Sequence, residues 1–177
     1  MIYFIILISI LLFALTPQGL VSQYGVSTTH LYEAFGYMLL HISWLHLIIN
    51  SVSLLMLWIP IRRIYSTHYN TNAIGLAASV YWAAVIAGAV CATDIPTVGM
   101  SGCVFFLLGV LLILNPTRKQ ALNYIWVALA VLVQIIFGKS NVPLHLFAFT
   151  EGIVYMCLRE FAHQYANKTG LFGVKEE

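Results

Sequence analysis

The chain has 177 residues, of which 61% are apolar and only 8% are charged, and its mean hydropathy is +0.91. An ordinary soluble domain has about 25% charged residues, so eight basic and six acidic side chains are too few to cover a water-facing surface. This composition excludes a soluble globular domain and a disordered chain, and a net charge of +2 without a basic run excludes a nucleic-acid-binding protein. The class that fits is a polytopic membrane protein.

Six apolar segments approach the length of about 20 residues that a membrane-spanning helix needs. They cover residues 1–16, 37–60, 73–92, 100–114, 121–137 and 144–162. The first segment has no basic residue before it and no clear cleavage site, so we expect a retained helix rather than a signal peptide. The sequence predicts an all-α fold, a bundle of six transmembrane helices that forms a single membrane domain over residues 1–177.

The basic residues predict the orientation of these helices. Seven of the eight lie at the end of, or after, the second, fourth or sixth segment, and only Lys139 falls in the opposite set of loops. Loops rich in Lys and Arg stay in the cytoplasm. We therefore expect both termini to be cytoplasmic and the loops 17–36, 93–99 and 138–143 to lie outside.

Several polar residues fall inside the predicted spans, where an unpaired polar group costs several kcal/mol. The second segment carries His41, His46 and Asn50, the fourth begins with Ser101, and the sixth begins with His145. In the predicted topology, all except Asn50 lie toward the outer ends of their helices. Polar residues at such depth are functional candidates by default.

This set of residue types suits acyl transfer. A serine hydroxyl is a weak nucleophile and needs an adjacent base, usually His, so we expect His145 to activate Ser101. The tetrahedral intermediate needs fixed donors around its oxyanion. His46, Asn50 and the backbone N–H of Ser101 are the candidates for that role.

Small residues predict how the fourth and sixth helices meet. Ala148 and Gly152 follow His145 along one face of a helix, in a pattern that permits close helix packing. Gly102 and Gly109 offer a matching face on the fourth segment, and Gly99 precedes Ser101. Close packing of these two faces would bring His145 to Ser101.

Together, these motifs resemble the rhomboid family of intramembrane serine proteases. The matching patterns are H-x4-H-x3-N from His41 to Asn50, GxSG-x6-G from Gly99 to Gly109, and H-x2-[small]-x3-G from His145. The resemblance covers all six segments in order.

The resemblance implies a Ser–His dyad without a catalytic carboxylate, with Ser101 as nucleophile and His145 as general base. It implies that His46 and Asn50 stabilise the oxyanion and that His41 is a structural or water-handling histidine. It places Phe105 where many members have a tyrosine that stacks on the catalytic histidine.

Substrates and location also follow from the resemblance alone. Substrates are single transmembrane helices that enter near the fifth segment and the first loop and are cut near the outer membrane face. A bacterial inner membrane is the expected location, and neither a metal nor another cofactor is expected. The first loop has Tyr32-Glu33 where Trp-Arg is frequent, which puts its conformation in question.

Three alternatives stay open at this point. One is a catalytically inactive rhomboid-like protein that binds membrane helices, and another is a small transporter or channel. The third is a metal site on His41, His46 and His145, which the absence of an HExxH motif disfavours. Glu151 lies off the face of His145, so we expect it to hydrogen-bond to another helix.

Overall fold

The computed structural model describes residues 1–114, 125, 128–129, 132 and 141–169. The longer helices are α1 (Ile2–Leu15), α3 (Trp44–His68), α4 (Ile74–Val90), α5 (Ser101–Ile113) and α7 (Val142–Thr169). Short elements join α1 to α3, namely α2 (Gln18–Val21), η1 (Ser22–Tyr24), η2 (Leu31–Phe35) and η3 (Tyr37–Leu39). The described residues form no strand and only two isolated β-bridges. The prediction of an all-helical fold is confirmed for this part of the chain.

The predicted helix ranges 1–16, 73–92 and 100–114 agree with α1, α4 and α5 within two residues at each end. The sixth predicted range, 144–162, is too short, because α7 runs from Val142 to Thr169. The fifth, 121–137, lies almost wholly outside the described residues.

The predicted range 37–60 for the second helix is wrong at both ends. The Ser43 hydroxyl accepts a hydrogen bond from the His46 N–H at 3.1 Å, so the helix is capped there and begins at Trp44. It continues through Pro60 to His68. Helices in membranes tolerate proline because neighbouring groups satisfy the freed carbonyl.

α3 has 25 residues and contains an 18-residue stretch with a mean hydropathy of 1.7, and it alone among the described helices is long and apolar enough to cross a membrane by itself. α1, α4 and α5 are apolar but shorter. The number of six crossings therefore stays a prediction.

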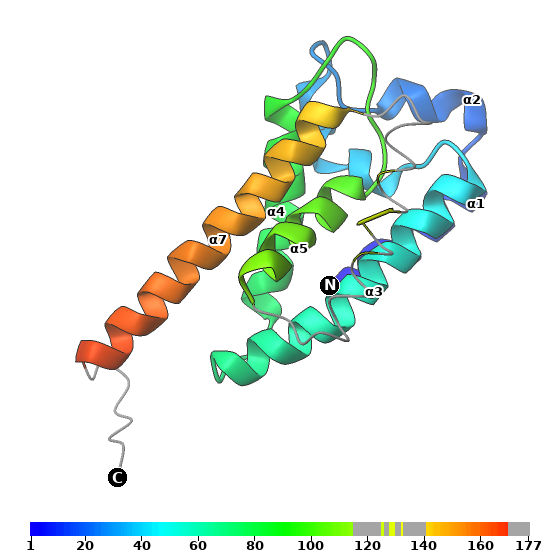
Figure 1. The fold of residues 1–177 in the computed structure, drawn as a ribbon. Helices are drawn as coiled ribbons and strands as arrows, with labels where there is room; N and C mark the ends of the chain where they lie inside the picture. The colour runs from blue at the N-terminus through cyan, green and yellow to red at the C-terminus, as the bar shows by residue number, and fades with distance from the viewer. Residues whose placement is uncertain (115–124, 126–127, 130–131, 133–140, 170–177) are drawn as a thin grey trace.

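α5 is the central helix of the described bundle. It contacts α3, α4 and α7, and its contact with α7 is the most extensive between any two described elements; Figure 1 shows it between α7 and α3. Gly109 and Gly152 make this contact possible, because a Cβ on Gly109 would overlap the Phe149 carbonyl and one on Gly152 would overlap the Phe106 carbonyl. The predicted close packing is present at Gly109 and Gly152, whereas Gly102 faces Tyr37, Leu144 and Ala84.

Far from the N-termini of α5 and α7, a polar cluster joins α3 to the second half of α7. Its members, here called the α3–α7 polar cluster, are Tyr65, His68, Tyr69, Tyr155, Arg159 and Glu160.

Each member of this cluster has a partner. The hydroxyl of Tyr69 donates to Glu160 at 2.8 Å, and His68 Nε2 lies 3.2 Å from the same carboxylate. The Tyr65 and Tyr155 hydroxyls lie 3.0 Å apart, and Arg159 donates to Tyr65 at 3.2 Å. These bonds fasten α3 to α7 at this end of the bundle.

Candidate active site

Ser101 is the first residue of α5, directly after a tight turn. Gly99 in that turn has φ +109°, a backbone conformation that side chains rarely adopt, and a Cβ there would lie 2.6 Å from His46 Cε1. Glycine is therefore required at this position for two independent reasons. Because the first N–H groups of a helix have no partner within it, the Ser101 N–H remains available to another acceptor.

Ser101 and His145 meet across the contact between α5 and α7. The Oγ of Ser101 lies 2.8 Å from Nε2 of His145, and the residues are only 8% and 5% exposed. Phe105, one turn after Ser101, stacks on the imidazole with a centroid distance of 4.4 Å and an interplanar angle of 16°. This stacking fixes the plane of the His145 ring and thereby directs Nε2 at the serine.

Two α3 side chains border the turn before Ser101. A Cβ on Gly99 would lie 2.8 Å from His46 Nε2 and 3.2 Å from Asn50 Nδ2, so both groups reach the backbone of this turn. They share a face of α3 because they are four residues apart. The ring of His41, which precedes α3, lies 5.0 Å from that of His46 between centroids.

Several buried polar atoms around the site have no hydrogen-bond partner in the described part of the chain. They are both ring nitrogens of His41, Nδ1 of His46, both amide atoms of Asn50 and Nδ1 of His145. Leaving a buried donor or acceptor unpaired costs about 1–3 kcal/mol. Such a concentration is unusual in a folded protein and indicates a place prepared for a polar ligand or for water.

Sequence reasoning missed Asn141, which holds the start of α7. Its Nδ2 donates to the Cys91 carbonyl at 2.7 Å and lies 3.3 Å from the Thr97 hydroxyl, while its Oδ1 accepts from the Leu144 N–H at 3.1 Å. Asn141 therefore caps α7 and ties it to the end of α4, one turn before His145. An Asn placed two residues before Pro143 is a helix-start signal that could have revealed it.

Tyr37 was also missed. It is fully buried, and its hydroxyl donates to the Ala84 carbonyl at 2.8 Å. Its carbonyl accepts from the Gly99 N–H at 3.0 Å, and its hydroxyl oxygen would lie 3.0 Å from a Cβ on Gly102. Tyr37 thus supports both sides of Ser101, and nothing in the local sequence distinguishes it from the other tyrosines.

The remaining candidates divide into two groups. Ala148 and Gly152 lie buried on the face of α7 that carries His145. Glu151 does not reach Ser101 or His145 by any hydrogen bond that the structure describes, and the predicted bond from Glu151 to another helix is absent among the same residues. The residues in 1–114 and 141–169 contain no group of three or more His, Cys, Asp or Glu arranged to hold a metal ion.

The comparisons with known proteins agree with the class that this arrangement defines, a helical membrane protein with a serine and a histidine in contact. The Rhomboid domain family matches residues 28–159, so the chain belongs to the rhomboid family and is an integral membrane protein. Members of this family are usually serine proteases that act on membrane proteins within the bilayer. No curated protein and no solved structure matches the chain.

Proposed function

We propose that this chain is an intramembrane serine endopeptidase that cleaves transmembrane substrate helices near the outer membrane face. The observation that supports it most is the 2.8 Å distance between Ser101 Oγ and His145 Nε2. A serine within hydrogen-bond reach of a histidine is the arrangement that activates a hydroxyl for nucleophilic attack.

In the acylation step, His145 accepts the hydroxyl proton as Ser101 Oγ attacks the carbonyl carbon of the scissile peptide bond. The carbon–nitrogen bond then breaks, and His145 donates the proton to the leaving amine. The product is an ester between Ser101 and the substrate. In the second step His145 takes a proton from water, which attacks the ester carbonyl; the bond to Ser101 Oγ then breaks, and His145 returns the proton to Ser101 Oγ.

The tetrahedral intermediates carry a negative oxygen next to Ser101. The Ser101 N–H, the Asn50 amide and the His46 ring are the donors that we assign to it. Asn50 Nδ2 has no partner among the described residues and borders the turn at Gly99. A donor that is fixed and unpaired before the reaction stabilises the oxyanion without reorganisation.

His41 packs against His46, and we assign it a supporting role in holding that ring or an ordered water. Phe105 keeps the imidazole of His145 in place by stacking. No carboxylate is needed to orient His145 in this proposal, because packing does so.

The wider proposal is a single domain over residues 1–177 with six crossings and both termini in the cytoplasm, in a bacterial inner membrane. Substrates, which are single-pass membrane proteins, would enter beside residues 121–137 and the first loop. Seven of eight basic residues on one side of the predicted topology support the orientation. No cofactor takes part.

Labelling by a fluorophosphonate, together with cleavage of a panel of reconstituted transmembrane substrates, tests this proposal. We expect the parent protein to be labelled and active, and Ser101→Ala to lose both properties while its thermal unfolding is unchanged. His145→Ala should also lose both. Ser9→Ala is the matched control, because Ser9 is a fully buried serine on α1 and its loss should leave labelling and cleavage intact.

Retained cleavage by Ser101→Ala would reject the mechanism. A folded parent protein that neither reacts with the probe nor cleaves any substrate would favour the inactive rhomboid-like binder instead. Labelling that survives in His145→Ala would remove the assigned base.

A further inference from the structure

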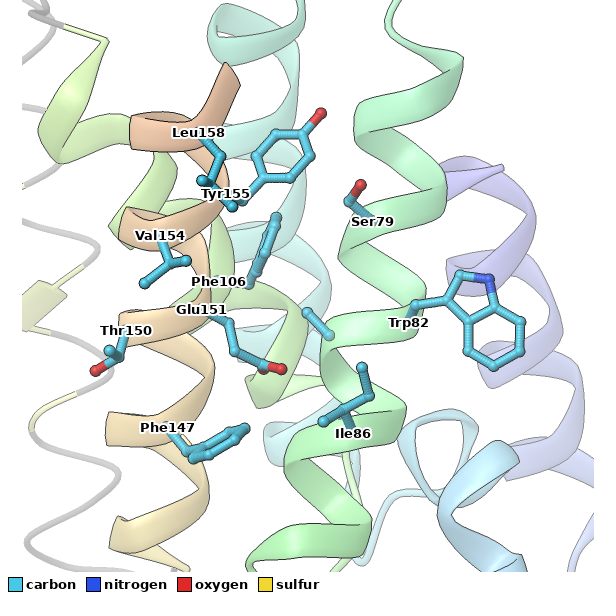
Figure 2. A pocket seen from close by; sticks show the side chains of 11 residues that line it. Ser79, Trp82, Ile86, Phe106, Phe147, Thr150, Glu151, Val154, Tyr155 and Leu158 are labelled. Carbon is cyan, nitrogen blue, oxygen red and sulfur yellow. The ribbon is translucent and has the colours of Figure 1, made fainter. Parts of the chain in front are cut away.

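A groove of about 470 Å³ opens between α4 and α7, away from the face of α7 that carries His145. Ser79, Ala83 and Ile86 line it from α4, and residues from Phe147 to Leu158 line it from α7. Phe106 of α5 is buried and closes its floor. Figure 2 shows that the side chains of Phe147 and Glu151 point from α7 toward α4.

Glu151 is chemically unusual among the residues that line this groove. It is the one Asp, Glu, Lys or Arg between residues 142 and 158. Its Oε2 is buried and has no hydrogen-bond partner in the part of the chain that is described. An apolar groove therefore contains a carboxyl group with one buried oxygen that has no hydrogen-bond partner among the described residues.

The depth of Glu151 indicates the kind of group that can pair with it. Glu151 lies about 13 Å along the axis from the start of α7 and about 12 Å before Arg159, the next charged residue. In the predicted topology α7 begins near the outer face, and the hydrocarbon core is about 30 Å thick, which puts the carboxyl group near its middle. The polar headgroup of a lipid stays at the interface, so its partner at this depth is a side chain of another membrane helix.

The shape of the groove fits a helix. Ser79 and Ala83 are small and four residues apart on α4, which lets another helix approach closely. The lining residues on α7 extend over twelve positions, or about 16 Å of helix. This length corresponds to about three turns of a docked helix.

We propose that the groove between α4 and α7 binds a transmembrane helix of another protein that carries a hydrogen-bonding side chain, such as Asn, near the middle of the bilayer. The polar side chain pairs with the Glu151 carboxyl, and the small residues of α4 receive the helix backbone. The site is separate from the one that holds Ser101, so a bound helix need not be a substrate.

Energy transfer in lipid vesicles tests this proposal. The full chain with Ser101→Ala, which prevents any cleavage, carries an acceptor fluorophore at its C-terminus. The probes are two synthetic leucine-rich transmembrane peptides with a donor fluorophore and either Asn or Leu at the centre, used at a peptide-to-lipid ratio at which peptides do not associate. We expect saturable transfer for the Asn peptide, with half-saturation at about tenfold lower peptide than for the Leu peptide.

Three further substitutions identify the groove as the binding site. Glu151→Leu should abolish the preference for the Asn peptide, and Glu151→Gln, which still hydrogen-bonds, should retain most of it. Ser79→Leu should fill the groove and weaken binding although Glu151 is intact. Val52→Leu, at a half-exposed position on α3 outside the groove, is the matched control and should change nothing.

Equal transfer for both peptides, or an Asn preference that survives both Glu151→Leu and Ser79→Leu, would overturn the proposal. Glu151-dependent transfer between two labelled copies of the chain, without peptide, would assign the groove to a second copy and would also overturn it. Because Ser101 is absent from the test, its result is independent of whether the chain is a protease.

Discussion

The two ends of the bundle formed by α3, α5 and α7 differ in how many of their polar groups have hydrogen-bond partners. Around Ser101, buried atoms of His41, His46 and Asn50 have no partner in the described part of the chain. In the α3–α7 polar cluster at the other end, the hydroxyls and the Glu160 carboxylate are paired at 2.8 to 3.2 Å.

This difference distinguishes the candidate active site around Ser101 from the α3–α7 polar cluster, which joins two helices. Paired polar groups in a membrane protein hold helices together and are satisfied without a ligand. Unpaired groups reduce the stability of the fold, so they are expected where a ligand or a reaction intermediate supplies the missing partner. Substitutions at the two ends should therefore affect different measurements.

The largest effect is expected between the two ends, at Gly152. Gly152→Leu places a side chain against the backbone of Phe106, so α5 and α7 must separate. We expect destabilisation of about 3 kcal/mol or more, with loss of cleavage, measured by thermal unfolding in detergent and by substrate cleavage. Cys157→Leu, at an exposed position on the same helix, is the control. If Gly152→Leu unfolded at the same temperature as this control, the packing at Gly152 would not support the site.

At the Ser101 end, Asn50→Ala and His46→Ala should each reduce the cleavage rate without unfolding the protein. Removal of one oxyanion donor typically reduces kcat by about 10²–10³. The measurement is kcat on a reconstituted transmembrane substrate. His68→Ala, which removes a histidine from the opposite end of α3, should cleave at the parent rate; parent rates for both site variants would remove His46 and Asn50 from the oxyanion role.

Asn141 should have a smaller effect, because it positions His145 and does not contact the reacting atoms. Asn141→Ala loses the cap of α7 and the bond to the Cys91 carbonyl, and a lost cap costs about 1 kcal/mol. We expect a roughly fivefold slower reaction of Ser101 with a fluorophosphonate, with an unchanged KM for the substrate.

The Asp variant separates the two contacts of Asn141. Asn141→Asp keeps the cap but loses the donor to Cys91, so its rate should fall between those of the parent and Asn141→Ala. A rate equal to that of the parent would show that the bond to Cys91 is unnecessary.

The smallest effect is expected in the α3–α7 polar cluster. Tyr69→Phe removes the hydroxyl that donates to Glu160 and should lower the free energy of unfolding by about 0.5–1.5 kcal/mol, while cleavage continues at the parent rate. Tyr3→Phe, at an exposed tyrosine on α1, is the control for stability. If Tyr69→Phe greatly reduced the cleavage rate at unchanged stability, the α3–α7 polar cluster would have a role in the mechanism, and the two ends would no longer differ in function.

The sequence predicted most of the helices because their signals are local. Long apolar runs bounded by proline and loop residues define α1, α4 and α5 within two residues. The predicted bounds of the second helix were wrong for two reasons. Ser43, a single capping residue inside an apolar stretch, decides where the helix begins, and Pro60 is tolerated within it. The predicted fifth helix lies almost wholly outside the described residues.

The candidate site was predictable in part for the same reason. His46 with Asn50, and His145 with Ala148 and Gly152, are spacings within one helix, and any residue at such a spacing shares a face. The roles assigned to these residues stay predictions until cleavage is measured. Asn141 and Tyr37 escaped because their partners, Cys91 and Ala84, are 50 and 47 residues away.

The sequence by itself determined that this protein resides in a membrane, that it is helical, and that a serine and several histidines fall within or at the ends of its apolar segments. These properties depend on composition and on short repeats along the chain. Only the tertiary structure decided that Ser101 and His145 lie 2.8 Å apart, that each residue of the α3–α7 polar cluster has a partner, and that Glu151 faces a groove. Contacts between distant segments depend on how whole helices pack; small residues indicated that α5 and α7 pack closely, but spacings within a helix do not give the distances between side chains on different helices.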